Sequence, residues 1–214
     1  MQQILRLSPS KLTFLLSECK RCFYMDIHKI YARPYSAFPS IFGKIDRAMR
    51  TTYQGKSSLK VTGKEGVFDT KEYKLVSTPE PISSEFAIQF SGKTDCLIDF
   101  ADETAGILDF KTSEVKEAKI ELYAPQLYAY REAYQHKPVS RMGLLCQSPS
   151  DQVEWIEGEL HLIMIETWVE IPINDEYWTA FKKDLAALLL TPFQEVEGNP
   201  KCPHCQYQKI IQGQ

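Results

Sequence analysis

Residues 91–113 read SGKTDCLIDFADETAGILDFKTS. Two mainly apolar runs in this stretch are separated by a polar segment at 102–106, a pattern typical of two strands joined by a short turn. We therefore expect a β-hairpin with strands over about 93–100 and 105–111. Acidic residues and a lysine near the strand ends are the first candidates for chemistry.

The alternation of side chains along these strands brings charged groups together. Asp109 and Lys111 share one face of the second strand, because successive side chains point to opposite faces. A loop centred near Glu103 would place Asp95 opposite Lys111 and diagonal to Asp109. Neighbours of this kind lie about 5 to 8 Å apart, close enough to share a cation. Two carboxylates beside a lysine suit hydrolysis assisted by magnesium or manganese, although D-x-K alone more often marks an exposed salt-bridged hairpin.

The segment after the hairpin predicts a helix over about 122–136. Leu122, Gln126, Ala129 and Ala133 fall on one stripe of this helix, so a glutamine stands where packing alone would favour an apolar residue. A hydrogen-bonded amide at the edge of the core is one interpretation. A polar side chain aimed at the hairpin is the other.

The remaining segments alternate between helical and strand patterns without an internal repeat, which favours an α/β sandwich with a mixed sheet. A first helix, capped by Ser8 or Ser10, is expected to run to about Tyr24, and a second begins near Ser40. The other expected elements are irregular strands within 54–84, strands over about 85–91, 139–147 and 158–171, and an Asn174-capped helix that ends at Thr191.

The charge is unevenly distributed along the 214 residues, although the formal net charge is only −3. Residues 1–60 contain eleven Lys and Arg against three Asp and Glu, whereas the remainder carries 14 against 25. The stretch KRCFYMDIHKIYARPY at 20–35 combines basic and aromatic residues, as expected of a surface that binds phosphates and stacks on unpaired bases. A solvated helix face is the alternative.

With 43% hydrophobic residues the chain can bury one substantial core, so we expect one domain over 1–214. Apolar runs are too short to span a membrane, and the first residues lack the pattern of a signal peptide. We therefore expect a cytoplasmic protein that does not bind membranes. In that reducing compartment, C-x-x-C pairs more often bind metal or carry out redox chemistry than form disulfides.

Six cysteines are present, and four of them form such pairs near the two ends of the chain. Cys19 and Cys22 make the first pair, and Cys202 and Cys205 make the second. A metal centre that joins the two ends is the natural interpretation. Cys96 and Cys146 stand in apolar stretches and are expected to be small buried residues.

Three segments together resemble the motifs of a known family: GKTD at 92–95, ILDFKTS at 107–113 and QLYAY at 126–130. They are similar to the G-x-x-D, D-x-K-T and Q-x-x-x-Y motifs of the PD-(D/E)XK superfamily, specifically of its RecB-like exonuclease branch, and they occur in the same order. The resemblance covers about residues 8–205. It implies a restriction-endonuclease-like core, a central mixed β-sheet flanked by helices.

The resemblance also implies roles for the residues of these motifs. Asp95 and Asp109 would be metal ligands, together with the backbone carbonyl of Phe110, and Lys111 would be the catalytic lysine. The two ends of the third motif, Gln126–Tyr130, would position the scissile strand or the lysine.

One position departs from the pattern of the branch. Its members usually carry G-x-x-x-H on the second helix, whose histidine joins the active-site metal, and this chain has Gly43-Lys-Ile-Asp46 there. Asp46 can replace the imidazole as an oxygen ligand of the metal. The change can also mean a weakened or lost activity, or Asp46 can simply pair with Arg50 one turn later.

The opening LSPSKLTFLLSECKRCFY at 7–24 resembles the N-terminal segment of iron–sulfur members, including CRISPR-associated RecB-like exonucleases and the AddB nuclease module. Those proteins tie one N-terminal and three C-terminal cysteines around a four-iron cluster, whereas this chain offers two and two. The resemblance implies a [4Fe–4S] cluster held within 8–35 and 192–210, and tetrahedral zinc is the close rival. The four implied ligands are Cys19, Cys22, Cys202 and Cys205.

The resulting functional hypothesis is a magnesium- or manganese-dependent exonuclease that acts on DNA, at single-stranded ends. A catalytically silent nucleic-acid-binding protein with a structural metal centre is the alternative. A site-specific endonuclease is a third interpretation, but the sequence offers no recognisable target-reading module. DNA repair, phage replication and CRISPR spacer acquisition all employ this branch, and the sequence specifies no protein partner.

Overall fold

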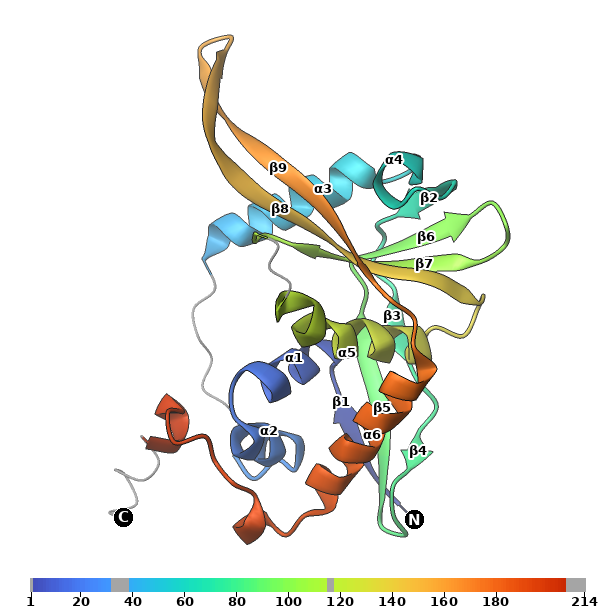
Figure 1. The fold of residues 1–214 in the computed structure, drawn as a ribbon, viewed down its shortest axis with the longest axis vertical. Coiled ribbons are helices and arrows are strands. Elements are labelled where there is room, and N and C mark those ends of the chain that lie inside the picture. The colour runs from blue at the N-terminus through green and yellow to red at the C-terminus, as the bar shows by residue number, and fades with distance from the viewer. Residues whose placement is uncertain (1, 32–38, 115–117, 207–214) are drawn as a thin grey trace.

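Two β-sheets and the helices packed on them make up residues 2–31, 39–114 and 118–206, which the computed structural model describes (Figure 1). One sheet contains β1 (Gln3–Leu7), β3 (Lys74–Val76), β4 (Glu80–Pro81) and β5 (Phe86–Lys93). The other contains β2 (Gly66–Asp69), β6 (Cys96–Phe100), β7 (Ala105–Lys111), β8 (Val139–Ile156) and β9 (Glu159–Ile171). The helices are α1 (Pro9–Ser17), α2 (Lys20–Ile27), α3 (Ser40–Tyr53), α4 (Leu59–Thr62), α5 (Ala118–Ala133) and α6 (Asp175–Leu190), with a 3₁₀ turn at Phe193–Glu195. The expected α/β fold with a mixed sheet flanked by helices is confirmed.

The five-stranded sheet has the order β2-β6-β7-β8-β9, in which only the β7–β8 pair is parallel. The helix α5 makes the crossover that a parallel pair requires. All of β7 except its last residue is buried, because both faces of the strand are covered. Ile107 packs in one apolar cluster with residues of α5, and Leu108 packs in another with residues of α3.

The expected β6–β7 hairpin is present, but its register was predicted wrongly by two residues. Cys96 lies opposite Leu108, because a backbone hydrogen bond of 3.0 Å closes the connection across residues 100–104 and centres it earlier than expected. Asp95, one residue before β6, therefore lies beside Asp109 rather than opposite the lysine two residues further on. The change brings the two carboxylates closer together than the sequence indicated.

The N-terminal region differs from the single long helix that was expected. The chain breaks between α1 and α2, where Cys19 has an extended backbone with φ −150° and ψ 117°. Before α1, the buried Leu5 and Leu7 alternate with exposed residues in β1, a short parallel partner of β5 that the sequence analysis missed. The break at Cys19 makes this residue the N-cap of α2, three positions before Cys22.

The expected α6 is confirmed at both ends. The Asn174 side chain accepts a hydrogen bond of 2.9 Å from the backbone N–H of Tyr177, and Thr191 follows the last helical residue. The helix α5 begins earlier and ends earlier than expected. None of the helices in the described ranges is long and apolar enough to cross a membrane.

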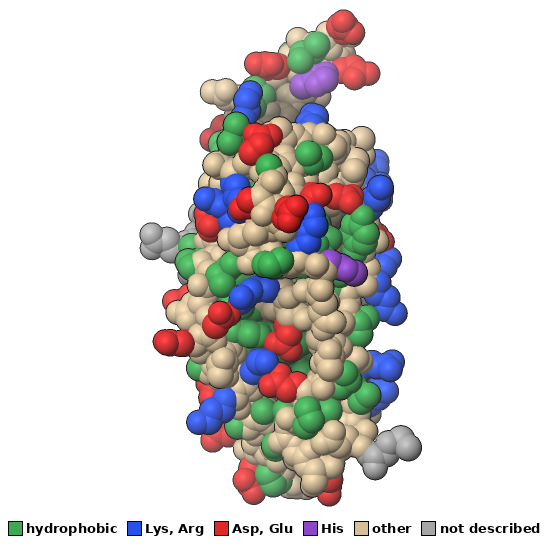
Figure 2. Space-filling model, turned by 90° about the vertical axis from the view of Figure 1, so that its right-hand side faces the viewer, with side chains coloured by type: hydrophobic (Ala, Val, Ile, Leu, Met, Phe, Trp, Pro, Cys, Tyr) green, Lys and Arg blue, Asp and Glu red, His purple; other side chains and the backbone are tan. Residues whose placement is uncertain are grey.

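Strands β8 and β9 extend beyond the sheet as a two-stranded arm (Figure 1). The sequence predicts a strand that ends near residue 147, but pairing between β8 and β9 resumes after an irregularity between Pro149 and Val153. Residues 151–162 are all exposed, and Trp155 is 73% exposed. Figure 2 shows acidic and hydrophobic side chains together at the tip of the arm. Because β8 runs parallel to β7, the arm leaves the sheet at the edge where β7 ends.

Candidate functional site

The candidate active site lies where β6 begins and β7 ends, because these antiparallel strands bring both points to one edge of the sheet. Asp95 occupies the bend between β5 and β6, and Asp109 and Lys111 lie near the end of β7. Gly92, the glycine of the G-x-x-D motif, lies under α1 and α5. A Cβ atom at this position would come within 2.7 Å of Pro9 and 3.2 Å of Tyr130, so the glycine allows both helices to approach the bend.

Both oxygens of the Asp95 carboxylate have protein donors. Its Oδ2 accepts a hydrogen bond of 3.0 Å from the backbone N–H of Phe110, and its Oδ1 lies 2.6 Å from Nη2 of Arg50. Burial raises the pKa of Asp95 to about 8, with a further contribution from the negative charge of Asp109, while Arg50 and Lys111 oppose this rise. The protonated form of Asp95 is therefore favoured up to about pH 8, although Arg50 pairs with its carboxylate.

Asp109 is almost fully buried, with 3% of its surface exposed. Its Oδ1 accepts a hydrogen bond of 2.8 Å from the Gln126 side chain. Its Oδ2 forms a buried ion pair with the Lys111 ammonium at 2.5 Å, and no other described group donates to this oxygen. A buried carboxylate oxygen whose described partner is a single lysine ammonium is a suitable ligand for a hard divalent cation.

Lys111 remains a cation in this environment. Burial alone would lower its pKa, but the charge and proximity of Asp109 outweigh burial and raise it. Its ammonium also lies 4.4 Å from the centre of the Tyr123 ring. A permanent positive charge is thus held next to the buried carboxylate, at the end of β7.

Gln126 and Tyr130 project from α5 toward the same bend, and both are buried. The Gln126 amide donates to Asp109, and its oxygen lies 3.5 Å from the Lys111 ammonium. The glutamine therefore points at the hairpin, as one of the two sequence interpretations expected. The Tyr130 hydroxyl donates to the backbone carbonyl of Lys93 with a distance of 2.7 Å, so this tyrosine fixes the chain just before Asp95.

Asp46 also reaches this edge of the sheet, from α3. Its Oδ2 accepts a hydrogen bond of 3.0 Å from Nε of Arg50, the pairing that the sequence analysis weighed as an alternative. The Arg50 guanidinium also donates a hydrogen bond to Asp95, a contact between distant segments that the sequence does not predict. An adjacent cavity has a volume of about 440 Å³. It is lined by Phe42, Gly43, Asp46, Met49, Phe110, Lys111 and Thr112.

A comparison of the sequence with known protein families agrees with this arrangement of residues. A family model of the PD-(D/E)XK nuclease superfamily matches residues 60–210, which is more than half of the chain. The chain belongs to the PD-(D/E)XK nuclease superfamily. Membership implies a nuclease that acts on nucleic acid, and the hairpin, Gln126 and Tyr130 all lie within the matched range.

A solved structure supports the fold of this PD-(D/E)XK protein. The crystal structure of SSO0001 superposes with a TM-score of 0.51 and 15% sequence identity, covering 90% of this chain and 81% of that chain. At this identity the likeness concerns the fold alone. None of the curated proteins matches the chain.

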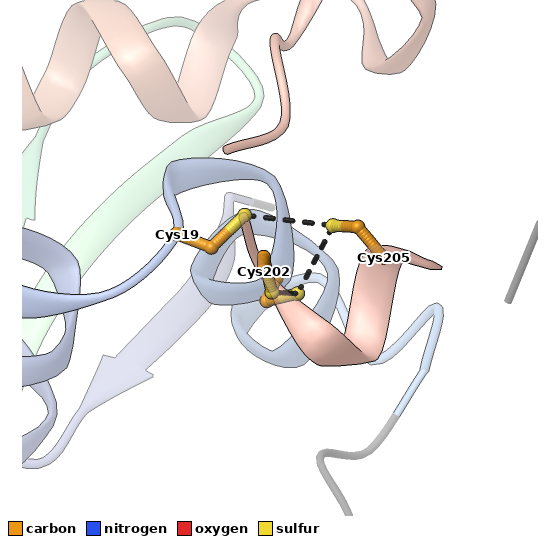
Figure 3. Close-up of side chains that lie close together, drawn as sticks. Cys19, Cys202 and Cys205 are labelled. Carbon is orange, nitrogen blue, oxygen red and sulfur yellow. Dashed lines mark hydrogen bonds between the residues drawn. The ribbon is translucent and has the colours of Figure 1, made fainter. Parts of the chain in front are cut away.

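The four paired cysteines lie together, although the two pairs are far apart in the sequence (Figure 3). Their sulfur atoms all lie within 4.8 Å of one another. The Cys22 sulfur is 3.5 Å from that of Cys205 and 3.6 Å from that of Cys202, and the Cys19 and Cys205 sulfurs are 3.5 Å apart. The expected meeting of the two ends of the chain is confirmed. Cys19 and Cys22 precede the range matched by the superfamily model.

The surroundings of these cysteines fit them to hold a metal. The Cys19 sulfur accepts a hydrogen bond of 3.3 Å from the backbone N–H of Asn199. Burial tends to raise the pKa of Cys19, but this bond and those from neighbouring cysteines lower it to about 7. Burial raises the pKa of Cys205 to about 11 and also raises that of Cys22. Metal binding would remove the thiol protons that burial retains.

Two aromatic residues of the basic stretch at 20–35, Phe23 and Tyr24, are not available to stack on bases as expected, whereas Tyr31 is 38% exposed. Phe23 and Tyr24 are only 5% and 7% exposed. The Tyr24 ring stacks on His28 at 4.2 Å between ring centres, and it lies against Phe193 from the other end of the chain. These rings pack in the interior because the apolar side of α2 faces the core. Residues 32–35 of this stretch lie outside the described residues.

As expected, Cys96 and Cys146 are buried and lie apart from the four-cysteine group. Arg50 is the main residue of the candidate site that sequence analysis missed. A basic residue four positions after an acid on a helix predicts a local ion pair. It gives no sign that the same guanidinium reaches Asp95, in the bend 45 positions further along the chain.

Proposed function

We propose that the chain is a magnesium- or manganese-dependent DNA exonuclease of the RecB-like branch, acting on single-stranded ends. One observation carries the proposal: the buried Asp109 carboxylate lies 2.5 Å from the Lys111 ammonium, and both charges act on Asp95, so two carboxylates and a lysine converge at one edge of the sheet. Oxygen donors of this kind suit hard cations. Superfamily membership supports the hydrolytic reaction, while the choice of DNA, the single-strand preference and the exonuclease mode come from the motif resemblance.

In the proposed mechanism, Asp95, Asp109 and the backbone carbonyl of Phe110 would hold the ion. When bound, it supplies Lewis-acid polarisation of the phosphate and a lower pKa for attacking water. Lys111 keeps its proton and places a positive charge where negative charge develops on the scissile phosphate. Gln126 holds Asp109 in position through its 2.8 Å hydrogen bond. The Tyr130 hydroxyl fixes the backbone that carries Asp95.

The proposal can be tested with linear and circular single-stranded DNA of the same sequence. With manganese or magnesium, we expect progressive loss of end-labelled linear DNA and no cleavage of the circle, because an exonuclease needs an end. A chelator should abolish the loss. Cleavage of circles would contradict the exonuclease mode, and undiminished cleavage in the chelator would contradict metal dependence. Labels at each end in turn give the polarity, and duplex DNA and RNA of the same sequence test the substrate preference.

A catalytically silent nucleic-acid-binding protein is the second candidate, and one observation favours it. Arg50 occupies Asp95 Oδ1, an oxygen that a catalytic metal would need. Under this alternative, DNA binds in a gel-shift assay but is not cleaved with either metal at any concentration. Cleavage that saturates with added manganese would exclude it.

For the cysteine centre we propose a structural metal ion that holds residues 1–214 as one domain by tying the two ends together. Three of the six sulfur–sulfur distances are 3.5 to 3.6 Å, and all four sulfurs lie within 4.8 Å of one another, which supports a single tetrahedral ion. Zinc–sulfur bonds of about 2.3 Å place tetrahedral thiolates about 3.8 Å apart. The [4Fe–4S] cluster implied by the resemblance binds each thiolate to a different iron, which requires wider spacing than this.

Metal analysis after anaerobic purification separates these two identities. One equivalent of zinc per chain, with no inorganic sulfide, would support the single ion. Iron and sulfide in equal amounts, with the broad visible absorption of a cluster, would support the cluster and would show that the sulfurs separate when it is bound. Replacing both Cys202 and Cys205 with serine provides the matched control, because either metal should then be lost.

A further inference from the structure

Arg50 on α3 joins two acids that lie on different elements. Its Nε donates to Asp46 Oδ2 at 3.0 Å, its Nη2 donates to Asp95 Oδ1 at 2.6 Å, and its Nη1 donates to the Asp95 backbone carbonyl at 3.0 Å. The Arg50 side chain is 18% exposed, so water weakens these contacts little. All three kinds of nitrogen in the guanidinium group are engaged. The backbone of Arg50 is fixed as well, because its carbonyl accepts a 2.9 Å hydrogen bond from Thr70.

The two proposed ligand carboxylates differ in the partners of their oxygen atoms. Asp95 has a partner for each oxygen, the guanidinium on Oδ1 and the Phe110 N–H on Oδ2. Asp109 Oδ2 has one ion pair, at 2.5 Å, with the ammonium of a flexible lysine side chain. A divalent cation must therefore displace a single ammonium contact at Asp109, whereas at Asp95 it must displace a guanidinium that three hydrogen bonds hold in place. An arginine does not yield by losing its proton, because guanidinium stays charged at any accessible pH.

We propose that Arg50 is a resident cation that competes with the catalytic metal for Asp95 and so sets the metal concentration at which the enzyme becomes active. This inference rests on the proposed nuclease function. On metal binding, the guanidinium gives up Asp95 Oδ1 and remains attached to Asp46 through Nε. Asp46 then serves as the anchor of Arg50 rather than as a ligand of the metal. Arg50 is a positioning residue, which acts through Asp95.

The test measures Mn²⁺ binding by electron paramagnetic resonance of the free ion, a readout that does not depend on activity. Arg50→Gln removes the competing charge, and Arg47→Gln removes an exposed arginine from the same helix. At about pH 9, where the Asp95 carboxylate is ionised, we expect Arg50→Gln to bind Mn²⁺ about tenfold more tightly, in line with the effect of one close opposite charge on a carboxylate. At lower pH the gain should shrink, because loss of the Arg50 charge also raises the pKa of Asp95. Arg47→Gln should bind as the natural protein does. Unchanged or weaker binding by Arg50→Gln would overturn the proposal.

Kinetics give a second readout that a merely structural role would not produce. Arg50→Gln should reach half-maximal cleavage at about one-tenth of the Mn²⁺ concentration, with a similar rate at saturation. A lower saturating rate without a change in metal requirement would contradict the competition. Should Arg50→Gln fail to fold, Arg50→Lys keeps the charge but cannot bridge both acids. It should then bind Mn²⁺ more tightly than the natural protein, and weaker binding would overturn the proposal.

The failure of this inference is distinguishable from failure of the proposed function. Asp109→Asn supplies the baseline, since it removes a proposed ligand carboxylate that Arg50 does not contact. If the natural protein binds Mn²⁺ above this baseline and cleaves DNA, but Arg50→Gln does not bind more tightly, only the role of Arg50 is wrong. If neither protein binds above the baseline nor cleaves DNA, the nuclease proposal fails together with it.

Discussion

The side chains of the two candidate metal sites in this protein have different kinds of hydrogen-bond and ion-pair partners. In the cysteine group the sulfurs have mainly one another as partners, at 3.5 to 3.6 Å. In the carboxylate site, Asp95 is held by Arg50 and a backbone N–H, and Asp109 is held by Lys111 and Gln126. Thiols are weak hydrogen-bond donors and acceptors, whereas ammonium and guanidinium groups are strong partners for carboxylates.

From this difference we expect the cysteine group to be a structural metal site and the carboxylate site to be a catalytic one. The cysteine group joins α2 to the segment around Cys202 and Cys205, and without a metal it leaves two buried and two half-buried thiols poorly satisfied. Its ion should therefore contribute to folding itself. The carboxylate site is electrostatically balanced by protein cations, so the fold does not need a metal there. Its ion should bind reversibly and matter for the reaction alone.

The largest expected effect comes from breaking the cysteine site. Cys202→Ser should abolish stoichiometric metal binding and lower the free energy of unfolding by about 4 kcal/mol or more, as loss of a structural metal does. Cys146→Ala is the matched control, because this cysteine is buried but lies outside the group. It should keep its metal and lose about 1 kcal/mol. Denaturant unfolding with metal analysis measures both, and equal losses in the two variants would contradict a structural centre.

Breaking the carboxylate site should affect activity far more than folding. Asp109→Asn keeps the side-chain shape and should reduce metal-dependent cleavage more than about 100-fold, since even indirect support of a metal is worth 10 to 100-fold. The metal at the cysteine group should remain. Asp99→Asn, an exposed acid of β6 paired with Lys137, is the control and should cleave normally. Comparable loss in both variants would show that the effect is not specific to the site.

The pH dependence of metal binding should report on Asp95. Its pKa is raised to about 8, mainly by burial, so the protonated form is favoured below that pH. Because a metal binds the carboxylate form, each binding event below about pH 8 releases a proton, and apparent Mn²⁺ affinity should fall about tenfold per pH unit. Above about pH 8 the affinity should level off. A flat profile from pH 6 to 9, measured by Mn²⁺ titration, would mean that Asp95 is either already ionised or not a ligand.

The smallest expected effect concerns the tyrosine that fixes the bend. Tyr130→Phe removes the hydrogen bond to the Lys93 carbonyl and should cost about 1 kcal/mol of stability, with a loss of cleavage of a few-fold. Tyr128→Phe offers a comparison on the same helix, because its hydroxyl bonds to Pro172, away from the site. That variant should lose similar stability and no activity. Equal activity in the two variants would deny Tyr130 a positioning role.

Local patterns in the sequence were enough to predict much of this fold. The β6–β7 hairpin, the Asn174 cap of α6 and the meeting of the cysteine pairs all follow from spacing and residue type. Gln126 was a conspicuous polar residue on a helical stripe, and it does point at Asp109. In each of these features the determining residues are close in sequence, or their chemistry limits the possible partners.

The features that were missed depend on tertiary geometry. The hairpin register changed by two residues because the position of its turn is set by one backbone hydrogen bond. Phe23 and Tyr24 are buried because the chain breaks before α2 and turns its apolar side inward, which helical periodicity does not reveal. The reach of Arg50 to Asp95 depends on how α3 packs against the sheet.

The most direct test of the account compares two lysines that each pair with an aspartate of the same sheet. Lys111 pairs with the buried Asp109, and Lys137 pairs with the exposed Asp99. With end-labelled single-stranded DNA and manganese, the natural protein and Lys137→Ala should degrade the DNA, while Lys111→Ala should bind DNA and keep its cysteine metal but not cleave. Cleavage by Lys111→Ala at the natural rate would contradict the proposed active site. DNA binding without cleavage by all three proteins would contradict the nuclease and favour a silent binder.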